Sequence, residues 1–259
     1  KENMDGNRFD VSGRDVIITG AGQGIGRDYA LAFVAAGAKP VLAEINGDKL
    51  RDVASEIEAR GGEAFAIETD VGSPDSVKAM VAATLEKYGQ IDVLINNAAI
   101  FANIPRRNFY DIPYDEWNNV LHVNITGSYL CASAVVPAMR KAGQGRIINI
   151  SSGTVPQGVP GFLHYVTSKA AIVGMTRVMA RELGDDNINV NAVMPGYTET
   201  EIDHTSMDDE LRQFIHEKRI LKRAETPEDL IGIVMFLASP ASSFITGQSI
   251  ACCGGEVML

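Results

Sequence analysis

One stretch decides the fold: Asp15-Val-Ile-Ile-Thr19-Gly20-Ala-Gly22-Gln-Gly24-Ile-Gly26, which continues into an apolar segment ending at Ala36. Its first five residues are rich in β-branched side chains and predict a buried strand. The glycines that follow predict a tight turn, because glycine adopts backbone conformations that other residues avoid. The segment after the turn has the apolar period of a helix. Strand, turn and helix in this order predict the first half of a βαβ unit.

The same alternation of short Val- and Ile-rich runs with longer helical segments continues along the chain. Nearly continuous apolar strands indicate burial on both faces, so we expect a parallel sheet covered by helices. Ser73-Pro74 and Thr226-Pro227 each place a capping hydroxyl before a proline, which predicts a helix start. The predicted strands comprise residues 15–19, 40–44, 64–67, 91–96, 146–151, 188–193 and 249–251.

No linker, repeat or low-complexity segment divides the chain of 259 residues, so we expect a single α/β domain. The domain should span residues 12–259. Residues 1–11 form an N-terminal extension, in which residues 1–3, ahead of Met4, are interpreted as a cloning remnant. Since no second domain is expected, the loops at the carboxyl ends of the strands should supply the substrate site.

Composition and charge exclude several classes of protein. A content of 46% apolar and 22% charged residues is typical of a globular protein with a large core. The formal net charge of -10 opposes binding to nucleic acid or anionic lipid, and no apolar run reaches the roughly 18 residues of a membrane span. Three cysteines without a metal-binding spacing favour a reducing compartment, so we expect a cytoplasmic protein. His122, His164, His204 and His216 show no ligand spacing, and we predict no metal site.

The glycine turn has the spacing T-G-x-x-x-G-x-G rather than the common G-x-G-x-x-G. Between a strand and a helix it predicts a dinucleotide site, where backbone amides and the helix N-terminus face the pyrophosphate. A side chain at Gly20 or Gly24 would block the close approach of that group. Without its context, the same cluster is an ordinary turn with a helix cap.

Glu44 ends the second predicted strand, 18 residues after Gly26. An acidic side chain at this point accepts hydrogen bonds from the adenosine ribose and repels the additional phosphate of NADP. Gln23, Ile45 and Asn46 supply no compensating cation. The pattern therefore predicts NAD as the cofactor, while Glu44 taken alone is equally compatible with a solvated strand end.

Tyr165 and Lys169 lie four residues apart in a run with helical period, so their side chains share one face. A tyrosine acts as a base at neutral pH only if its pKa falls by about three units, which corresponds to roughly 4 kcal/mol. An ammonium about 4 Å away supplies about that energy at an effective dielectric near 20. Ser152 ends a predicted strand 13 residues earlier and can hold a substrate oxygen beside the phenol. We therefore predict proton transfer by Tyr165.

Each of these residues also has a purely structural interpretation. Tyr165 can be a packed helical aromatic, Lys169 a surface charge and Ser152 a turn residue at a strand end. Asn124 lies within the apolar residues 120–130, where a buried amide needs hydrogen-bond partners, and it can be a helix-bending amide.

Taken together, the motifs resemble the short-chain dehydrogenase/reductase family in order and spacing over almost the whole chain. The resemblance implies a single Rossmann-type, doubly wound domain with a seven-stranded parallel sheet. It also implies NAD or NADP as the hydride carrier and a homotetramer. The residues that carry it are residues 19–26, Asn96-Asn97-Ala98-Ala99, Asn124, Ser152, Tyr165-x-x-x-Lys169 and Pro195-Gly196.

The resemblance further implies a role for individual residues. Asp70, ahead of Val71, should contact the adenine, and residues 195–200 should hold the nicotinamide. Asn124 should hold a water that links Lys169 to solvent. The implied catalytic tetrad is Asn124, Ser152, Tyr165 and Lys169.

Two positions depart from the family pattern. Ala99 stands where the family has glycine, and its methyl group is tolerable if the backbone there is not left-handed. Cys252-Cys253 before Gly254-Gly255 replaces a frequent aspartate, which changes a contact of the tail rather than the chemistry.

We therefore expect an NAD-dependent short-chain alcohol dehydrogenase acting on a secondary alcohol or ketone, or on a sugar- or hydroxy-acid-type substrate, with Tyr165 as acid and base. An NADPH-dependent ketoreductase of the 3-oxoacyl type and a catalytically inactive dinucleotide-binding regulator stay open as alternatives. The predicted cofactor contacts are Gly20, Gln23, Gly24, Ile25, Gly26, Glu44, Ile45, Asp70, Val71, Asn97, Ala98, Ala99, Tyr165, Lys169, Pro195, Gly196, Thr198 and Thr200, and the predicted substrate pocket comprises Ile100, Phe101, Thr154, Val155, His164 and Tyr197.

Overall fold

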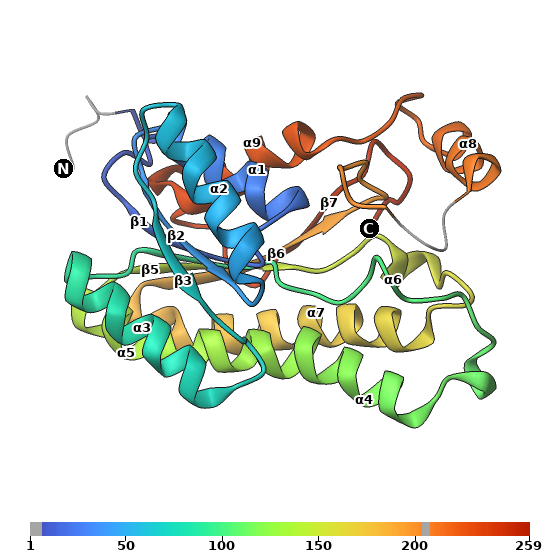
Figure 1. Ribbon diagram of the computed structural model, residues 1–259, viewed down its shortest axis with the longest axis horizontal. Helices are drawn as coiled ribbons and strands as arrows, with labels where there is room; N and C mark the ends of the chain where they lie inside the picture. The colour runs from blue at the N-terminus through green and yellow to red at the C-terminus, as the bar shows by residue number, and fades with distance from the viewer. Residues whose placement is uncertain (1–6, 204–207) are drawn as a thin grey trace.

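The computed structural model describes residues 7–203 and 208–259 of the chain. They form one seven-stranded sheet in the order β3-β2-β1-β4-β5-β6-β7, and every pair of neighbouring strands is parallel. Helices cover both faces of the sheet (Figure 1). The predicted doubly wound α/β domain is therefore confirmed. Residues 1–6, with the proposed cloning remnant, and His204 lie outside the described residues.

The strands begin and end within two residues of the predicted positions. Residue by residue, the side chains of β1 alternate between the two cores: Val16 and Ile18 belong to one cluster and Ile17 to the other. This is the period that a strand buried on both faces requires. The strands are β1 Asp15–Thr19, β2 Lys39–Glu44, β3 Phe65–Glu68, β4 Val93–Asn96, β5 Gly145–Ile150, β6 Ile188–Pro195 and β7 Ser249–Cys252.

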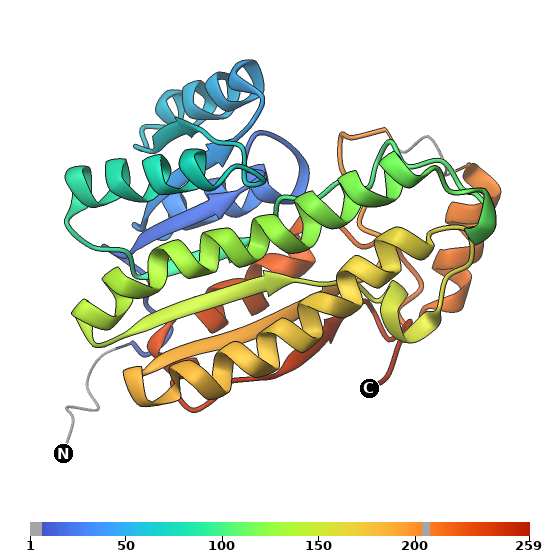
Figure 2. The same cartoon turned by 90° about the horizontal axis from the view of Figure 1, so that it is seen from below.

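Three helices pack on each face. The first core cluster contains side chains from α1 (Gly24–Ala35), α2 (Gly47–Ala59) and α9 (Pro227–Ala238). The second contains side chains from α3 (Pro74–Tyr88), α5 (Ser128–Ala142) and α7 (Leu163–Leu183), and Figure 2 shows α5 and α7 crossing that face. The remaining helices and turns are η1 Phe109–Asp111, α4 Tyr114–Leu121, η2 His122–Gly127, α6 Thr154–Gln157, η3 Gly184–Asp186, α8 Asp209–Lys218 and η4 Pro240–Ser242.

Both predicted helix starts are present. The Ser73 hydroxyl accepts a hydrogen bond from the backbone N–H of Ser76 at the start of α3. Thr226 and Asp229 form a reciprocal capping box at the start of α9, where each side chain meets the other's backbone N–H. These contacts satisfy amide groups that the first helical turn leaves without partners.

The core extends beyond the predicted domain boundary at residue 12. Val11 is buried in the first core cluster, and the backbone carbonyl of Arg8 accepts a hydrogen bond from Ala241 N–H beside η4. Phe9 also packs against Phe236 of α9, with ring centroids 6.0 Å apart. Part of the expected N-terminal extension therefore belongs to the domain.

One helix could span a membrane by its length and composition, although the sequence has no uninterrupted apolar run of that length. Within the described part of the chain, α4, η2 and α5 join into a helix, Tyr114–Ala142, that is long and apolar enough to do so by length and composition. Polar residues interrupt its sequence, so no uninterrupted apolar run is visible there. Cys131, Val135 and Met139 of this helix are buried in the second core cluster. We therefore interpret it as a core helix.

Candidate active site

A cavity of about 940 Å³ opens where the carboxyl ends of the parallel strands meet. Its lining runs from Glu44 at the end of β2, past the glycine turn after β1, to Tyr165 and the loop after β6. This edge is where an open parallel sheet binds its ligands, because the loops that follow the strands gather there. The two ends of the cavity differ in chemistry and are described in turn.

The glycine turn packs against the loop after β4. Gly20 is left-handed, with φ of +65°, and a Cβ there would lie 2.9 Å from Ala98 Cα. A Cβ on Gly26 would lie 2.1 Å from the Gly20 carbonyl oxygen, so no side chain fits. Thr19 Oγ1 accepts hydrogen bonds from the N–H groups of Asn97 and Ala98, both at 3.0 Å. The turn is therefore a close backbone cradle that opens into the cavity.

The motif predicts that Gly24 faces the pyrophosphate of a dinucleotide, but in the structure it contacts Glu201 and Ile202. Its N–H donates to Glu201 Oε1 at 2.7 Å, and Gly24 is not among the residues that line the cavity. A Cβ at this position would meet Ile202 Cδ1 at 2.7 Å. The neighbouring Gln23 and Ile25 do line the cavity, so the turn presents these residues to a ligand.

Two backbone amides orient the Glu44 carboxylate at the edge of the cavity. Gly22 N–H donates to Glu44 Oε2 at 3.2 Å, and Asn46 N–H donates to Oε1 at 2.9 Å. Glu44 is only 9% exposed. Ile45, Asp70 and Val71 line the same end of the cavity. A fixed carboxylate in this place can accept hydrogen bonds from the hydroxyls of a ligand.

Lys49 is a residue that the sequence interpretation missed. It lies in the first turns of α2, lines the cavity, and its ammonium donates to the Gln23 side chain. The end of the cavity that holds Glu44 therefore also contains a cation. No sequence motif marks Lys49; only the direction of α2 after β2 brings it there.

The middle of the cavity is lined by the loops after β4 and β6. The loop after β4 contributes Asn97, Ala98 and Ala99, and the loop after β6 contributes Pro195, Gly196, Thr198 and Thr200. Among the residues that the structure describes, Asn187 is the one non-glycine with positive φ. Ala99 is therefore not left-handed, and its methyl group is accommodated.

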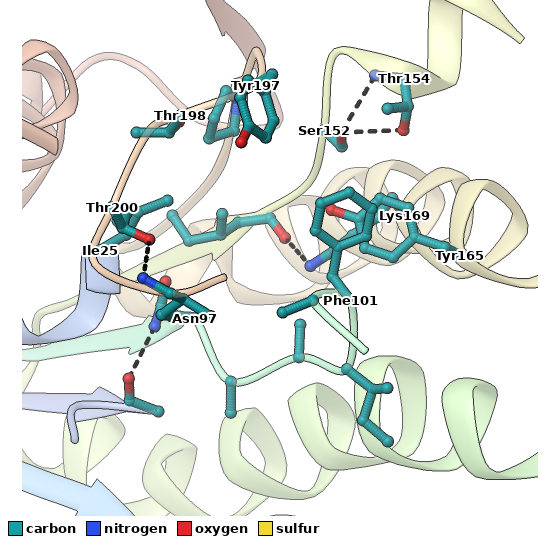
Figure 3. A pocket seen from close by; sticks show the side chains of 18 of the residues that line it. Ile25, Asn97, Phe101, Ser152, Thr154, Tyr165, Lys169, Tyr197, Thr198 and Thr200 are labelled. Carbon is teal, nitrogen blue, oxygen red and sulfur yellow. Dashed lines mark hydrogen bonds between the residues drawn. The ribbon is translucent and has the colours of Figure 1, made fainter. Parts of the chain in front are cut away.

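Ser152, Tyr165 and Lys169 gather at the far end of the cavity (Figure 3). Ser152 follows β5, and its Oγ accepts hydrogen bonds from Thr154 N–H at 3.1 Å and Thr154 Oγ1 at 2.9 Å. Lys169 Nζ donates to the Ile150 carbonyl oxygen at 2.8 Å and lies 5.7 Å from the centre of the Tyr165 ring. The predicted juxtaposition of hydroxyl, phenol and ammonium is present.

Asn124 supports this group from behind the cavity wall. It lies in the π-helical turn η2 and is 1% exposed. Its Oδ1 accepts from Ile100 N–H at 2.8 Å, and its Nδ2 donates to the Ile100 carbonyl at 3.3 Å and to Ser168 Oγ at 3.0 Å. These bonds tie the loop after β4 to α7 beside Lys169. The predicted water contact of Asn124 stays a prediction.

The wall around Tyr165 is aromatic. The Phe101 ring stacks on Tyr165 with centroids 4.3 Å apart, and Phe162 lies 5.7 Å from Phe101. Thr154 and Tyr197 line this end, as predicted. Leu211 and Phe214 on α8 also line the cavity, and they lie in the amphipathic segment 197–223, which follows a predicted strand and is expected to contribute to the substrate site.

Two predicted pocket residues lie elsewhere. Val155 is not among the residues that line the cavity, since the short helix α6 turns it away. His164 is fully buried, and its Nε2 lies 3.2 Å from Glu116 Oε1 of α4 rather than facing the cavity. A position next to a cavity residue on a helix points in another direction, which explains both corrections.

The comparisons with known proteins agree with this geometry. A family model described as enoyl-(acyl carrier protein) reductase matches residues 20–256. The chain is 38% identical to a 3-oxoacyl-[acyl-carrier-protein] reductase of Synechocystis sp., over 93% of this chain and 96% of that protein. It is 34% identical to the 7alpha-hydroxysteroid dehydrogenase of Escherichia coli K12, over 98% of each chain.

A solved structure from Beutenbergia cavernae, described as an NAD(P) dependent gluconate 5-dehydrogenase with NADP bound at low occupancy, superposes with a TM-score of 0.89. It shares 35% identity and covers 96% of this chain and 99% of its own. The chain belongs to the short-chain dehydrogenase/reductase family. It is accordingly an oxidoreductase that binds a nicotinamide dinucleotide, as the family resemblance predicts.

In this short-chain dehydrogenase/reductase, the protein alone does not produce the lowered phenol pKa that the sequence interpretation requires. Burial raises the pKa of Tyr165 to about 12, and a hydrogen bond with Ser152 only partly opposes this. Burial also lowers the pKa of Lys169 to about 8, so its ammonium is still mostly charged at neutral pH but loses its proton in mildly alkaline solution. The ammonium donates to the Ile150 carbonyl and lies 5.7 Å from the centre of the Tyr165 ring, and burial is the dominant influence on the phenol pKa.

Proposed function

We propose that this chain is an NAD-dependent oxidoreductase that interconverts a secondary alcohol and a ketone, with Tyr165 as acid and base. The observation that carries the proposal is one cavity that holds the Tyr165 and Ser152 hydroxyls at one end and the fixed Glu44 carboxylate at the other. Sugar- and hydroxy-acid-type alcohols belong to the same substrate class. The aromatic wall around Tyr165 favours substrates with a substantial apolar face.

The residues present fit a dinucleotide. The cradle at Gly20 and Gly26 admits no side chain, which leaves room for close approach of phosphate groups to the backbone. The Glu44 carboxylate is oriented to accept ribose hydroxyls, and we assign the adenine contact to Asp70, which lines the same cavity. Bound NAD supplies the hydride acceptor, and its positively charged ring favours ionisation of a nearby phenol.

The chain's own residues explain the proton chemistry. Ser152 Oγ accepts two hydrogen bonds from Thr154, and its own proton, which faces the Tyr165 oxygen, can be redirected to a substrate oxygen that enters between the two hydroxyls. Since the pKa of Tyr165 is raised, the phenol is protonated at neutral pH and can donate its proton to a carbonyl oxygen. Oxidation of an alcohol needs the phenolate, which forms at higher pH. Lys169 is held beside the phenol by the Ile150 carbonyl.

A screen of secondary alcohols, sugars and ketones tests the proposal. Turnover followed by NADH absorbance should occur on both an alcohol and its corresponding ketone. The cofactor is then compared on one substrate, and NAD should give the higher kcat/KM. No turnover across the panel, together with tight binding of NADH, would instead identify a catalytically inactive dinucleotide-binding protein.

A second candidate function is an NADPH-dependent reductase of 3-oxoacyl substrates. Lys49 at the Glu44 end of the cavity favours it, because an ammonium there can pair with an additional phosphate. The Synechocystis relative has a name of this type. Lys49→Ala discriminates the two: it should weaken NADP binding selectively if this function is correct, and should leave the NAD reaction nearly unchanged.

The homotetramer and the cytoplasmic location remain proposals. Apolar side chains on the outer faces of α5 and α7 support assembly, since Tyr129 is 53% and Val178 56% exposed. Light scattering coupled to gel filtration should give four times the chain mass of 27.8 kDa, and a single-chain mass would contradict the assembly.

A further inference from the structure

The protein contains a buried charged cluster that the proposed reaction does not use. Arg219, directly after α8, is 1% exposed. Its guanidinium lies 3.6 Å from the Glu225 carboxylate and 3.4 Å from the Glu256 carboxylate. A charge inside a protein is strongly unfavourable unless it is paired and hydrogen-bonded, so the three side chains are held together.

The cluster forms hydrogen bonds with the backbone of the loop after β6. Arg219 Nη2 donates to the Tyr197 carbonyl oxygen at 2.5 Å. Gly196 N–H donates to both Glu225 oxygens, at 3.1 and 3.2 Å, and Thr198 Oγ1 donates to Glu225 Oε1 at 2.8 Å. A Cβ on Gly196 would lie 2.7 Å from Glu225 Oε2, so the loop lies directly on the cluster.

The same cluster reaches the opposite wall of the cavity. Glu256 lines the cavity, and its Oε1 accepts a hydrogen bond from Gln157 Nε2 of α6 at 3.1 Å. Gly153 N–H, next to Ser152, also donates to the Pro195 carbonyl at 2.7 Å. The loop after β6 and the segment that carries Ser152 are therefore joined through charged and backbone contacts.

Because the side chains of Glu225 and Glu256 are buried, their carboxylates depend on the positive charge of Arg219. The pKa of Glu225 is raised to about 7 by burial, against the opposing effects of Thr198 and Arg219. Removal of Arg219 would leave two buried carboxylates without a cation, which favours movement of the loop toward solvent. The loop's position thus depends on the cluster as a unit.

We propose that Arg219, Glu225 and Glu256 are positioning residues that fix residues 195–198 against the nicotinamide ring. The inference rests on the proposed function, because it requires a nicotinamide beside this loop. None of the three needs to touch a reacting atom. They act through the backbone of Gly196 and Tyr197, and through Gln157 on the facing wall.

The experiment compares the dissociation constants of NADH and of ADP-ribose, which lacks the nicotinamide, by isothermal titration calorimetry. Arg219→Met should weaken NADH binding about 10-fold and change ADP-ribose binding by less than about 2-fold, because only the nicotinamide end loses its support. Arg223→Met is the matched control. Arg223 pairs with Asp229 on the surface, 58% exposed, and both ligands should bind that variant as they bind the wild type.

The possible results distinguish a failure of the inference from a failure of the proposed function. If the wild type binds NADH no more tightly than ADP-ribose, the proposed position of the nicotinamide is wrong, and the inference falls with it. If the wild type binds NADH more tightly than ADP-ribose and Arg219→Met keeps the same difference in affinity, only the inference is overturned. Equal weakening of both ligands by Arg219→Met would show a merely structural role and would also overturn it.

Two further variants guard against a failure to fold. Glu225→Gln keeps the side-chain volume and leaves Arg219 paired with Glu256, and it should reduce the discrimination in the same direction. Arg219→Lys keeps the positive charge and should recover part of the discrimination lost in Arg219→Met. Unchanged discrimination in a folded Glu225→Gln protein would contradict the proposal.

Discussion

Replacement of Glu44 by glutamine should remove most of the preference for NAD over NADP. Glu44 is 9% exposed, and each oxygen of its carboxylate accepts one backbone N–H, from Gly22 and Asn46. Glutamine has the same shape but one acceptor fewer, so it loses one of these bonds and its negative charge. The side chain should then orient less well toward a ribose.

Two effects set the size of the change. A phosphate charge about 5 Å from the carboxylate is repelled by about 3 kcal/mol at an effective dielectric of 20, which is about 100-fold in affinity. A lost hydrogen bond between a carboxylate and a ribose hydroxyl weakens NAD by about 1.5 kcal/mol, or about 10-fold. Lys49 beside Gln23 already offsets part of the repulsion. We therefore expect Glu44→Gln to lower the ratio of kcat/KM with NAD to kcat/KM with NADP by about 100-fold, which is less than the two effects would give together.

The assay measures initial rates with subsaturating NAD and NADP on one substrate, for wild type, Glu44→Gln and Glu68→Gln. Glu68 is the matched control, because it pairs with Glu44 in register on β3 but does not line the cavity. Its substitution should leave the ratio unchanged. A wild type that prefers NADP, or a ratio that Glu44→Gln does not move, would refute the reasoning.

Three further predictions concern stability and pH. Gly26→Ala should lower the free energy of unfolding, measured in urea, by about 2 kcal/mol or more, since its Cβ would overlap the Gly20 carbonyl. Gly232→Ala in α9 is the control: its Cβ meets no atom, and it should raise the free energy of unfolding by up to about 1 kcal/mol. The raised pKa of Glu225 means that the folded state binds its proton more tightly than the unfolded state, so the free energy of unfolding should fall as the pH rises from about 4.5 to about 7. Glu225→Gln should remove at most about 1.4 kcal/mol per pH unit of that slope. An unchanged slope would contradict the raised pKa. Carbonyl reduction should vary little between about pH 6 and about pH 8, while alcohol oxidation should rise with pH, because the pKa of Tyr165 is raised; parallel profiles would argue against Tyr165 as the proton donor.

The strand, the glycine turn and the acidic strand end could be predicted because they depend on local pattern and short spacing. β1 begins and ends at the predicted residues, and Glu44 lies at the cavity as its distance from Gly26 suggested. Tyr165 and Lys169 share a face because the helical period fixes it. These features do not depend on how distant side chains pack.

Side-chain direction and burial could not be predicted in the same way. Lys49 reaches the cavity only because α2 turns back toward Gln23, and His164 points to Glu116 although its neighbour Tyr165 faces the cavity. The direction of the Tyr165 pKa shift depends on desolvation, which outweighs the hydrogen bond with Ser152. Each of these outcomes follows from contacts between segments far apart in the chain.

Tyr165→Phe tests the central claim most directly, because it removes one oxygen atom from the cavity wall and preserves the ring that stacks on Phe101. Turnover on the best alcohol and ketone and the dissociation constant of NADH are measured on the same preparation. We predict that turnover falls by about 1000-fold, as expected for loss of the acid and base, while NADH binding changes by less than about 2-fold. Turnover close to that of the wild type would contradict the account.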